Sequence, residues 1–116
     1  MALTEQDAFN KIYEWFSDPS HAKSYDAHQM LCKYRDDHGN KCAIGVLIPD
    51  ELYDPAMENM SLGEVVDRLP SVFDDVNMSM NFLLRVQHAH DDAHDRENVI
   101  EQLQIVADGF QLEVPA

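Results

Sequence analysis

The stretch Lys41-Cys-Ala-Ile-Gly-Val-Leu-Ile-Pro-Asp-Glu-Leu-Tyr-Asp-Pro55 contains the longest uninterrupted apolar run of this chain. The run includes one of the two cysteines, Cys42, and a glycine, Gly45, and it leads into an acidic turn between two prolines. A glycine inside an apolar run indicates that another backbone approaches closely. We therefore expect residues 42–48 to form the core element on which the flanking helices pack, and residues 50–55 to present carboxylates at the surface.

A short β-hairpin is expected to lead into this core element. Residues 28–34 alternate between two sets of side chains, as in a strand with one face partly buried. Residues 36–40 contain glycine, asparagine and aspartate, which favour a turn. A brief return strand near residues 40–42, followed by a buried helical turn, completes the expected hairpin.

The register of this hairpin decides where the two cysteines lie. In a hairpin centred on Asp37, Cys32 and Cys42 face each other, and together with a histidine they form a conceivable metal site. The signal is weak because neither cysteine belongs to a Cys-x-x-Cys pair. In the alternative arrangement, Asn40 caps a short helix that starts near Cys42 and ends before Pro49.

Capping signals mark the starts of three helices. Thr4 with Asp7, and Ser61 with Glu64, each combine a hydroxyl cap with a carboxylate three residues later. Asp95 is the expected cap of the last helix. These signals indicate helices after residues 4, 61 and 95.

Apolar positions three and four residues apart predict which face of each helix is buried. The first helix is expected to stop before Pro19, and a further helix is expected over residues 80–94. The expected inner positions are Phe9, Ile12, Tyr13 and Phe16; Leu62, Val65, Val66 and Leu69; Met80, Leu83, Leu84 and Gln87; and Val99, Leu103, Val106 and Phe110.

These elements predict a single domain over residues 1–116. Its expected class is α+β, mostly helical, with about four to five helices packed with a small antiparallel β-hairpin. Hydrophobic residues make up 45% of the chain, which is enough to build a core.

The chain is strongly acidic. It has 22 acidic and 8 basic residues, so its formal net charge is −14. This sign argues against direct binding of nucleic acid, but it suits a protein that occupies a basic groove on a partner. No apolar window approaches the ~18 residues of a membrane span, and two cysteines are too few for a disulfide scaffold, so we expect no membrane contact and a cytoplasmic location.

Two motifs suggest a relationship. Residues 41–58 read Lys-Cys-Ala-Ile-Gly-Val-Leu-Ile-Pro-Asp-Glu-Leu-Tyr-Asp-Pro-Ala-Met-Glu, and residues 83–91 read Leu-Leu-Arg-Val-Gln-His-Ala-His-Asp. The chain resembles, over roughly residues 30–110, short uncharacterised proteins of tailed bacteriophages and their bacterial hosts. It departs from their helix motif by an extra His-Ala pair before His90. The resemblance implies a phage or prophage origin and supplies no catalytic residues.

The segment from His88 to Asp95 is the densest group of possible metal ligands. On a continuous helix, His90 and His94 lie one turn apart, a spacing that suits a divalent metal. The segment lacks the His-Glu-x-x-His pattern of metalloproteases. The alternative interpretation is a solvated helix end at which histidines pair with aspartates.

Cys42 is the second candidate for chemistry. A cysteine at the start of a helical turn has a lowered pKa and becomes a better nucleophile. A histidine of the 88–94 segment, oriented by Asp91, would then act as its base. The alternative is a small buried residue, as cysteines next to Ala and Ile usually are. Phosphate-binding loops, dinucleotide-binding glycine motifs and serine nucleophile elbows are absent from the sequence.

The carboxylates themselves are the third candidate. Spread over a folded surface, they imitate the phosphates of a nucleic acid toward a basic protein. The expected partner-binding residues are Asp50, Glu51, Asp54, Glu58, Asp91, Asp92 and Asp95.

We therefore expect a small acidic non-enzymatic interaction protein, a phage-type inhibitor of a host nucleic-acid-handling or defence complex, with a basic nucleic-acid-binding host protein as its partner. One alternative is a metal- or thiol-dependent enzyme that uses Cys42 and the segment from His88 to Asp95. The other is a homo-oligomeric regulatory or structural module with an adaptable apolar contact. The methionines that would line this contact are Met57, Met60, Met78 and Met80.

Overall fold

The computed structural model describes residues 4–21, 25–26, 31–36, 39–73, 78–93 and 95–115 of the 116-residue chain. Five α-helices lie within these residues: α1 (Glu5–Ser17), α2 (Ala43–Leu47), α3 (Leu62–Arg68), α4 (Met80–Asp91) and α5 (Arg96–Phe110). Two 3-10 helices, η1 (Asp50–Leu52) and η2 (Pro55–Asn59), connect α2 to α3. Two-residue strands, β1 (Tyr25–Asp26) and β2 (Leu31–Cys32), precede α2.

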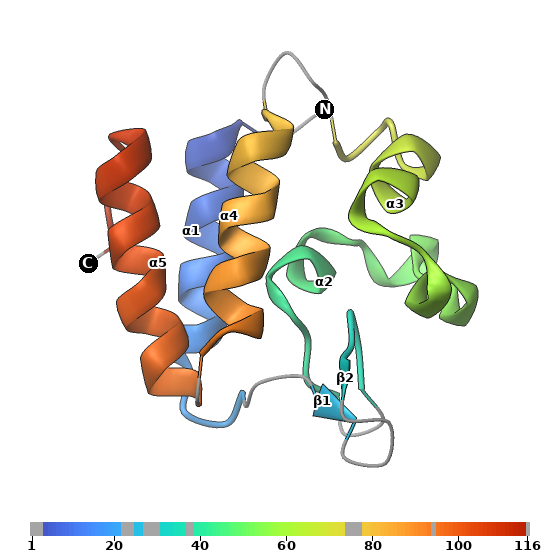
Figure 1. Cartoon of the computed structure of the whole chain (residues 1–116), viewed down its shortest axis with the longest axis horizontal. Coiled ribbons are helices and arrows are strands. Elements are labelled where there is room, and N and C mark those ends of the chain that lie inside the picture. Colours follow the sequence, from blue (N-terminus) through green and yellow to red (C-terminus); the bar gives the residue numbers. More distant parts are fainter. Residues whose placement is uncertain are drawn as a thin grey trace.

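The long helices α1, α4 and α5 form one side of the molecule, and α2 lies against it (Figure 1). Helix α5 packs on both α1 and α4, and α2 contacts α1 and α4 from the other side. Helix α3 lies beyond α2 and away from the three long helices (Figure 1). The short helix α2 therefore occupies the centre of the fold, as its apolar sequence predicts.

Helix α1 follows its sequence signals. The Thr4 hydroxyl accepts the N–H of Asp7 at 3.1 Å, and the Asp7 carboxylate accepts the N–H of Thr4 at 3.3 Å. The helix ends at Ser17, and Asp18 is its extended C-cap before Pro19. Both predicted ends are confirmed. The buried side chains of α1 are Ala8, Phe9, Ile12 and Phe16.

Helix α2 is held against a neighbouring backbone at Gly45. A Cβ at this position would lie 2.0 Å from the carbonyl oxygen of Tyr34, so only glycine fits. The predicted close approach is therefore confirmed. Cys42 is the N-cap of α2, and its Sγ accepts the N–H of Gly45 at 3.3 Å.

The predicted α+β class with its β-hairpin is wrong, because the fold is built from helices. Over the described residues 31–34 and 40–42, the expected strand and return strand do not form a ladder. An isolated bridge joins Arg35, just after the first segment, to Lys41. Strand β2 pairs instead with β1, upstream of it, and two residues on each side are too short to make a layer.

Two local causes end the pairing after one bridge. The N–H of Cys42 donates to the carbonyl of Tyr34 at 3.1 Å, so Cys42 faces Tyr34 and not Cys32. Cys42 then caps α2, and the chain turns into a helix. The N–H groups of Tyr34 and Arg35 donate to the carboxylate of Glu58, so this carboxylate takes backbone donors that the sequence pattern assigned to a strand ladder.

The caps predicted for the later helices are confirmed. Ser61 and Glu64 form a capping box at α3, and Asp95 accepts the N–H of Asn98 at the start of α5. Helix α4 differs from the prediction in two ways. It ends at Asp91, before residue 94, and its buried side chains are Phe82, Leu83, Val86, Ala89 and His90.

The prediction that Met80 and Leu84 point inward is wrong, because they are 37% and 41% exposed. The buried face of α4 is rotated toward Phe82 and Val86, which contribute to one continuous apolar core with side chains from all five helices. Among the helices of the described residues, none has the length and apolar character needed to cross a bilayer.

Candidate functional site

The acidic turn after α2 is tied to the rest of the chain through Arg35. The Arg35 guanidinium lies 2.9 Å from the carboxylate of Asp50 and donates to the carbonyl of Ile48 at 2.6 Å. Its Cζ lies 4.7 Å from the centre of the Tyr53 ring. Lys41 also reaches Asp50, at 3.6 Å. Lys41 and then Arg35 hold the pKa of Asp50 below its usual value.

Lys41 connects this turn to helix α1. Its Nζ lies 4.7 Å from the centre of the Trp15 ring. The ring of His21 stacks on Trp15 with 3.5 Å between the ring centres, and its Nδ1 lies 2.7 Å from the carbonyl oxygen of Trp15. The C-terminal end of α1 and the acidic turn therefore share a charged and aromatic contact.

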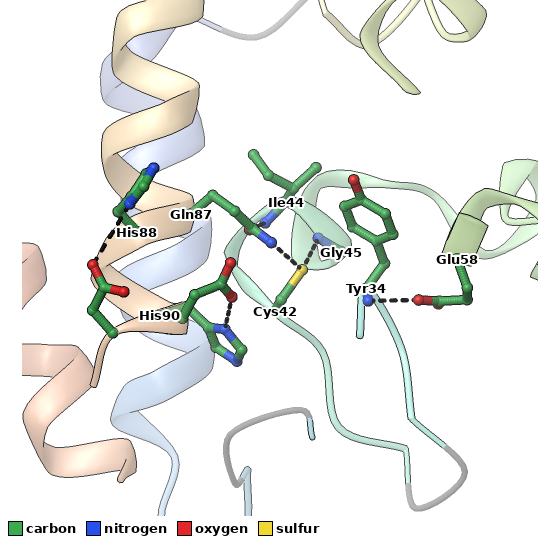
Figure 2. Close-up of polar contacts among 10 residues, drawn as sticks. Tyr34, Cys42, Ile44, Gly45, Glu58, Gln87, His88 and His90 are labelled. Carbon is green, nitrogen blue, oxygen red and sulfur yellow. Dashed lines mark hydrogen bonds and ion pairs between the residues drawn. The ribbon is translucent and has the colours of Figure 1, made fainter. Parts of the chain in front are cut away.

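Glu58 is the carboxylate with the most backbone partners in this segment. It accepts the N–H of Tyr34 at 2.9 Å, the N–H of Arg35 at 3.0 Å and the hydroxyl of Tyr53 at 2.5 Å. Figure 2 shows Glu58 reaching from η2 to the loop at Tyr34. Because Glu58 is partly buried, its carboxylate positions the loop before α2.

Asp54 has a structural role of the same kind. Its carboxylate caps η2 by accepting the N–H of Ala56, and it lies 3.1 Å from the guanidinium of Arg68 in α3. Asp50, Asp54 and Glu58 thus contact groups of their own chain. Among the four carboxylates expected to bind a partner here, Asp50 and Glu51 are both exposed at the surface of η1, and Asp50 is the one held by Arg35 and Lys41.

Cys42 lies at the centre of the molecule. It is fully buried, and burial raises the pKa of its thiol to about 12. The side-chain amide of Gln87 donates to its Sγ at 3.4 Å, while the Gln87 carbonyl accepts the N–H of Ile44 (Figure 2). Gln87 thereby joins α4 to the first turn of α2. These contacts describe a capping residue, and a thiol with so high a pKa is a poor nucleophile at neutral pH.

The two described histidines of the 88–94 segment point in different directions. His90 is fully buried, with its ring centre 5.7 Å from that of Phe16 and its Nδ1 2.8 Å from the carboxylate of Asp91. His88 is exposed and lies 3.5 Å from the carboxylate of Asp92 (Figure 2).

The metal pair predicted at His90 and His94 depended on a helix that continues through both residues. Helix α4 ends at Asp91, and His94 lies outside the described residues. Within the described part of the chain, no group of three or more His, Cys, Asp or Glu side chains is placed to hold a metal ion.

The second acidic segment, Asp91, Asp92 and Asp95, lies where α4 passes into α5. All three residues are exposed. Asp91 is the last residue of α4 and Asp92 is its C-cap, while Asp95 caps α5. Asp92 and Asp95 contact neighbours in sequence, namely His88 and Asn98. Asp91 contacts His90, and its charge adds to the effect of burial in raising the pKa of Cys42 and of Tyr34.

A groove lies between α4 and α5 that the sequence pattern did not predict. It encloses about 440 Å³. Its apolar side chains include Leu84, which is 41% exposed, and Ile105, which is 63% exposed. Arg85, His88 and Asp92 line the α4 side. Ile105 lies outside the apolar stripe predicted for α5. An isoleucine on the polar face of a helix is the one sequence signal that could have indicated an exposed apolar surface here.

Comparisons of the chain with protein-family models, with curated proteins and with solved structures found no match.

Proposed function

We propose that this chain is a small, acidic, non-enzymatic interaction protein of phage type, which inhibits a nucleic-acid-handling or defence complex of a bacterial host. It occupies a basic surface of a host protein that otherwise holds nucleic acid. The proposal rests on the carboxylates around the junction of α4 and α5, in a chain whose net charge is −14.

The position of Asp91 and Asp92 is the observation that carries the proposal. Both stand at the C-terminal end of α4, where the helix dipole is negative and a carboxylate is unfavourable. The side chain of Asp92 is 76% exposed, and its ion pair in the described residues is with the exposed His88, one turn earlier on the same helix. Carboxylates that lower the stability of their own helix, and that are exposed, are better explained by an external partner than by folding.

The neighbouring sequence extends this acidic surface. Residues 80–110 contain six carboxylates and two arginines. One of the two arginines, Arg96, is directed toward α1, where it donates to the carbonyl of Phe16 at 2.6 Å. A surface of this sign attracts a basic protein, accelerates its association and loses this advantage as salt screens the charges.

The test uses the immobilised protein and a nuclease-treated bacterial lysate at low and at high salt. We expect basic nucleic-acid-binding proteins to be retained at low salt, released at high salt and displaced by short duplex DNA. The variant Asp91→Asn, Asp92→Asn, Asp95→Asn should retain much less of these basic proteins, because it lacks three negative charges. Asparagine is chosen because its side chain can still accept the capping hydrogen bonds.

The matched control is the variant Glu14→Gln, Asp67→Asn, Glu113→Gln, which removes three exposed charges at other places on the surface. It should bind nearly as well as the unchanged protein. If no basic protein is retained at low salt, or if both triple variants lose binding equally, the proposal is refuted.

A further inference from the structure

His21 lies against the C-terminal end of α1. Its Nδ1 is 2.7 Å from the carbonyl oxygen of Trp15, which belongs to the last turn of the helix. Because a carbonyl oxygen can only accept a hydrogen bond, Nδ1 carries the proton of the neutral ring and Nε2 carries none. The imidazole also stacks on the Trp15 indole, with 3.5 Å between the ring centres and 12° between the planes. These two contacts fix the position of the ring before it gains a second proton.

The surroundings of this ring interact better with a charged imidazole than with a neutral one. The carboxylate of Asp18 lies 3.9 Å from Nε2, which presents a lone pair to it in the neutral ring and an N–H in the charged ring. The last carbonyl groups of α1 form the negative end of the helix dipole, where a charged histidine is stabilising. The face of an indole also attracts a cation. The His21 side chain is 27% exposed, so water screens these attractions incompletely.

The carboxylate of Asp18 is charged throughout the range in which a histidine titrates. It accepts the N–H of Ser20 at 2.9 Å and the Ser20 hydroxyl at 2.8 Å. These hydrogen bonds hold the pKa of Asp18 below its ordinary value, and the charges of His21 and Arg96 add to this effect. A proton that binds to His21 therefore meets a negative charge at this place.

Lys41 brings a permanent positive charge to the same indole, with its Nζ 4.7 Å from the centre of the ring. It also lies 3.6 Å from the carboxylate of Asp50, which offsets this charge. Arg96, at the start of α5, acts on Asp18 less strongly than His21 does. Among the charges that the described residues place around His21, the attraction of Asp18 therefore outweighs the repulsion.

We infer that His21 is a proton-controlled latch, a side chain whose charged form fastens the residues after α1 to the end of that helix. The charged ring binds the helix end, the indole and the Asp18 carboxylate together. The neutral ring keeps the hydrogen bond and the stacking, but it turns a lone pair toward the carboxylate. Because Lys41 joins the same indole to Asp50, the latch also affects the contact between α1 and the acidic turn.

The sign of the pH dependence follows from the form that the folded chain prefers. The stability contributed by a charged histidine is complete below the ordinary histidine range, near pH 6.5, and is lost as the pH rises above it. The latch is therefore closed in mild acid and loosened at pH 8. It is separate from the carboxylates of the α4–α5 junction on which the proposed function rests.

The first test is His21→Gln in the full-length protein. Glutamine can still donate to the Trp15 carbonyl, but it cannot become charged. We expect the unfolding temperature of this variant to lie below that of the unchanged protein by about 5 °C at pH 5.5 and by about 2 °C at pH 8. An equal loss at both pH values would mean that the ring serves only as packing, and it would overturn the latch.

The second test changes the carboxylate and keeps the histidine. Asp18→Asn retains an acceptor for Ser20 and removes the charge that faces Nε2. It should lower the unfolding temperature at pH 5.5, and raise it slightly at pH 8, where a carboxylate at the end of α1 is unfavourable. The matched control is Asp108→Asn, at an exposed carboxylate in the last turn of α5, which should act in the same direction at both pH values.

Amide hydrogen exchange, corrected for its intrinsic pH dependence, locates the effect. The N–H groups of Asp18 and His21 donate to the carbonyls of Trp15 and Asp18. Their protection should be about fivefold greater at pH 5.5 than at pH 8 in the unchanged protein, and equal at the two pH values in His21→Gln. Asp18→Asn decides the matter by itself if His21→Gln does not fold. Parallel pH profiles of Asp18→Asn and Asp108→Asn would refute the latch and leave the charge-based proposal standing.

Discussion

Asp50, Asp54 and Glu58 contact residues far away in the sequence, whereas the described contacts of Asp92 and Asp95 are with residues nearby in the sequence. The first group binds Arg35, Arg68 and the loop at Tyr34, from 14 to 24 residues away. The second group, Asp92 and Asp95, lies at helix ends, and its described contacts are with residues four and three positions away. Both groups look alike as sequence, yet only the first holds distant parts of the chain together.

This difference separates carboxylates that hold the fold together from carboxylates that are available to a partner. Removing a carboxylate of the first group leaves backbone donors or guanidinium groups without their acceptor. Removing one of the second group changes mainly the surface charge and the interaction with a helix dipole. Stability and binding should therefore respond oppositely in the two regions.

The largest effect is expected for Glu58→Ala. Two backbone N–H groups and the Tyr53 hydroxyl lose their acceptor in a partly buried place, so the free energy of unfolding should fall by about 3 kcal/mol. Urea denaturation followed by circular dichroism measures this change. Glu51→Ala, at an exposed carboxylate seven residues earlier, should change stability by no more than about 0.5 kcal/mol. Equal effects of the two substitutions would remove the distinction between carboxylates that accept hydrogen bonds from distant segments and carboxylates that do not.

An intermediate effect is expected in alkali at Cys42. Its thiol has a pKa of about 12 when folded and an ordinary value of 9.0, so the unfolded chain loses this proton first. The stability that depends on the neutral thiol is therefore complete below pH 9 and declines as the pH rises from 9 toward 12. Cys42→Ser keeps a capping side chain that does not titrate in this range.

Urea denaturation of both proteins at several pH values between 8 and about 11 measures the difference. The free energy of the unchanged protein should fall more steeply than that of Cys42→Ser. Parallel curves would mean that the buried thiol does not disfavour its charged form.

The smallest effect, opposite in sign, is expected for Asp92→Asn. Removing a negative charge from the C-terminal end of α4 should raise the free energy of unfolding by about 0.5 kcal/mol at pH 8. Asp95→Asn, which retains a good cap at the N-terminus of α5, loses a favourable charge and should be slightly destabilising. Thermal unfolding at low salt resolves both signs. A loss of stability in Asp92→Asn would show that this carboxylate serves the fold after all.

Features that depend on adjacent residues were predictable from the sequence. Thr4, Ser61 and Asp95 each cap a helix whose first turn follows at once, and the end of α1 is fixed by Pro19. The glycine in the apolar run correctly indicated a close backbone neighbour. Such signals need no knowledge of how distant segments meet.

The errors arose where distant segments decide the outcome. The alternation over residues 28–34 resembles a strand, but Glu58, more than twenty residues later, accepts the backbone N–H of Tyr34 and that of the next residue, Arg35. Leu84 fits an inward helical stripe, yet α4 is rotated so that Phe82 and Val86 fill the core. The groove beside Leu84 was missed for the same reason, because its second wall is contributed by α5.

The contact of Lys41 with Trp15 has an optical consequence. Trp15 is the only tryptophan of the chain, and Lys41 links it to Asp50 of the acidic turn. Its fluorescence therefore reports, without any added label, whether α1 and the turn remain in contact. The protein thus contains an intrinsic fluorescent probe of the acidic turn.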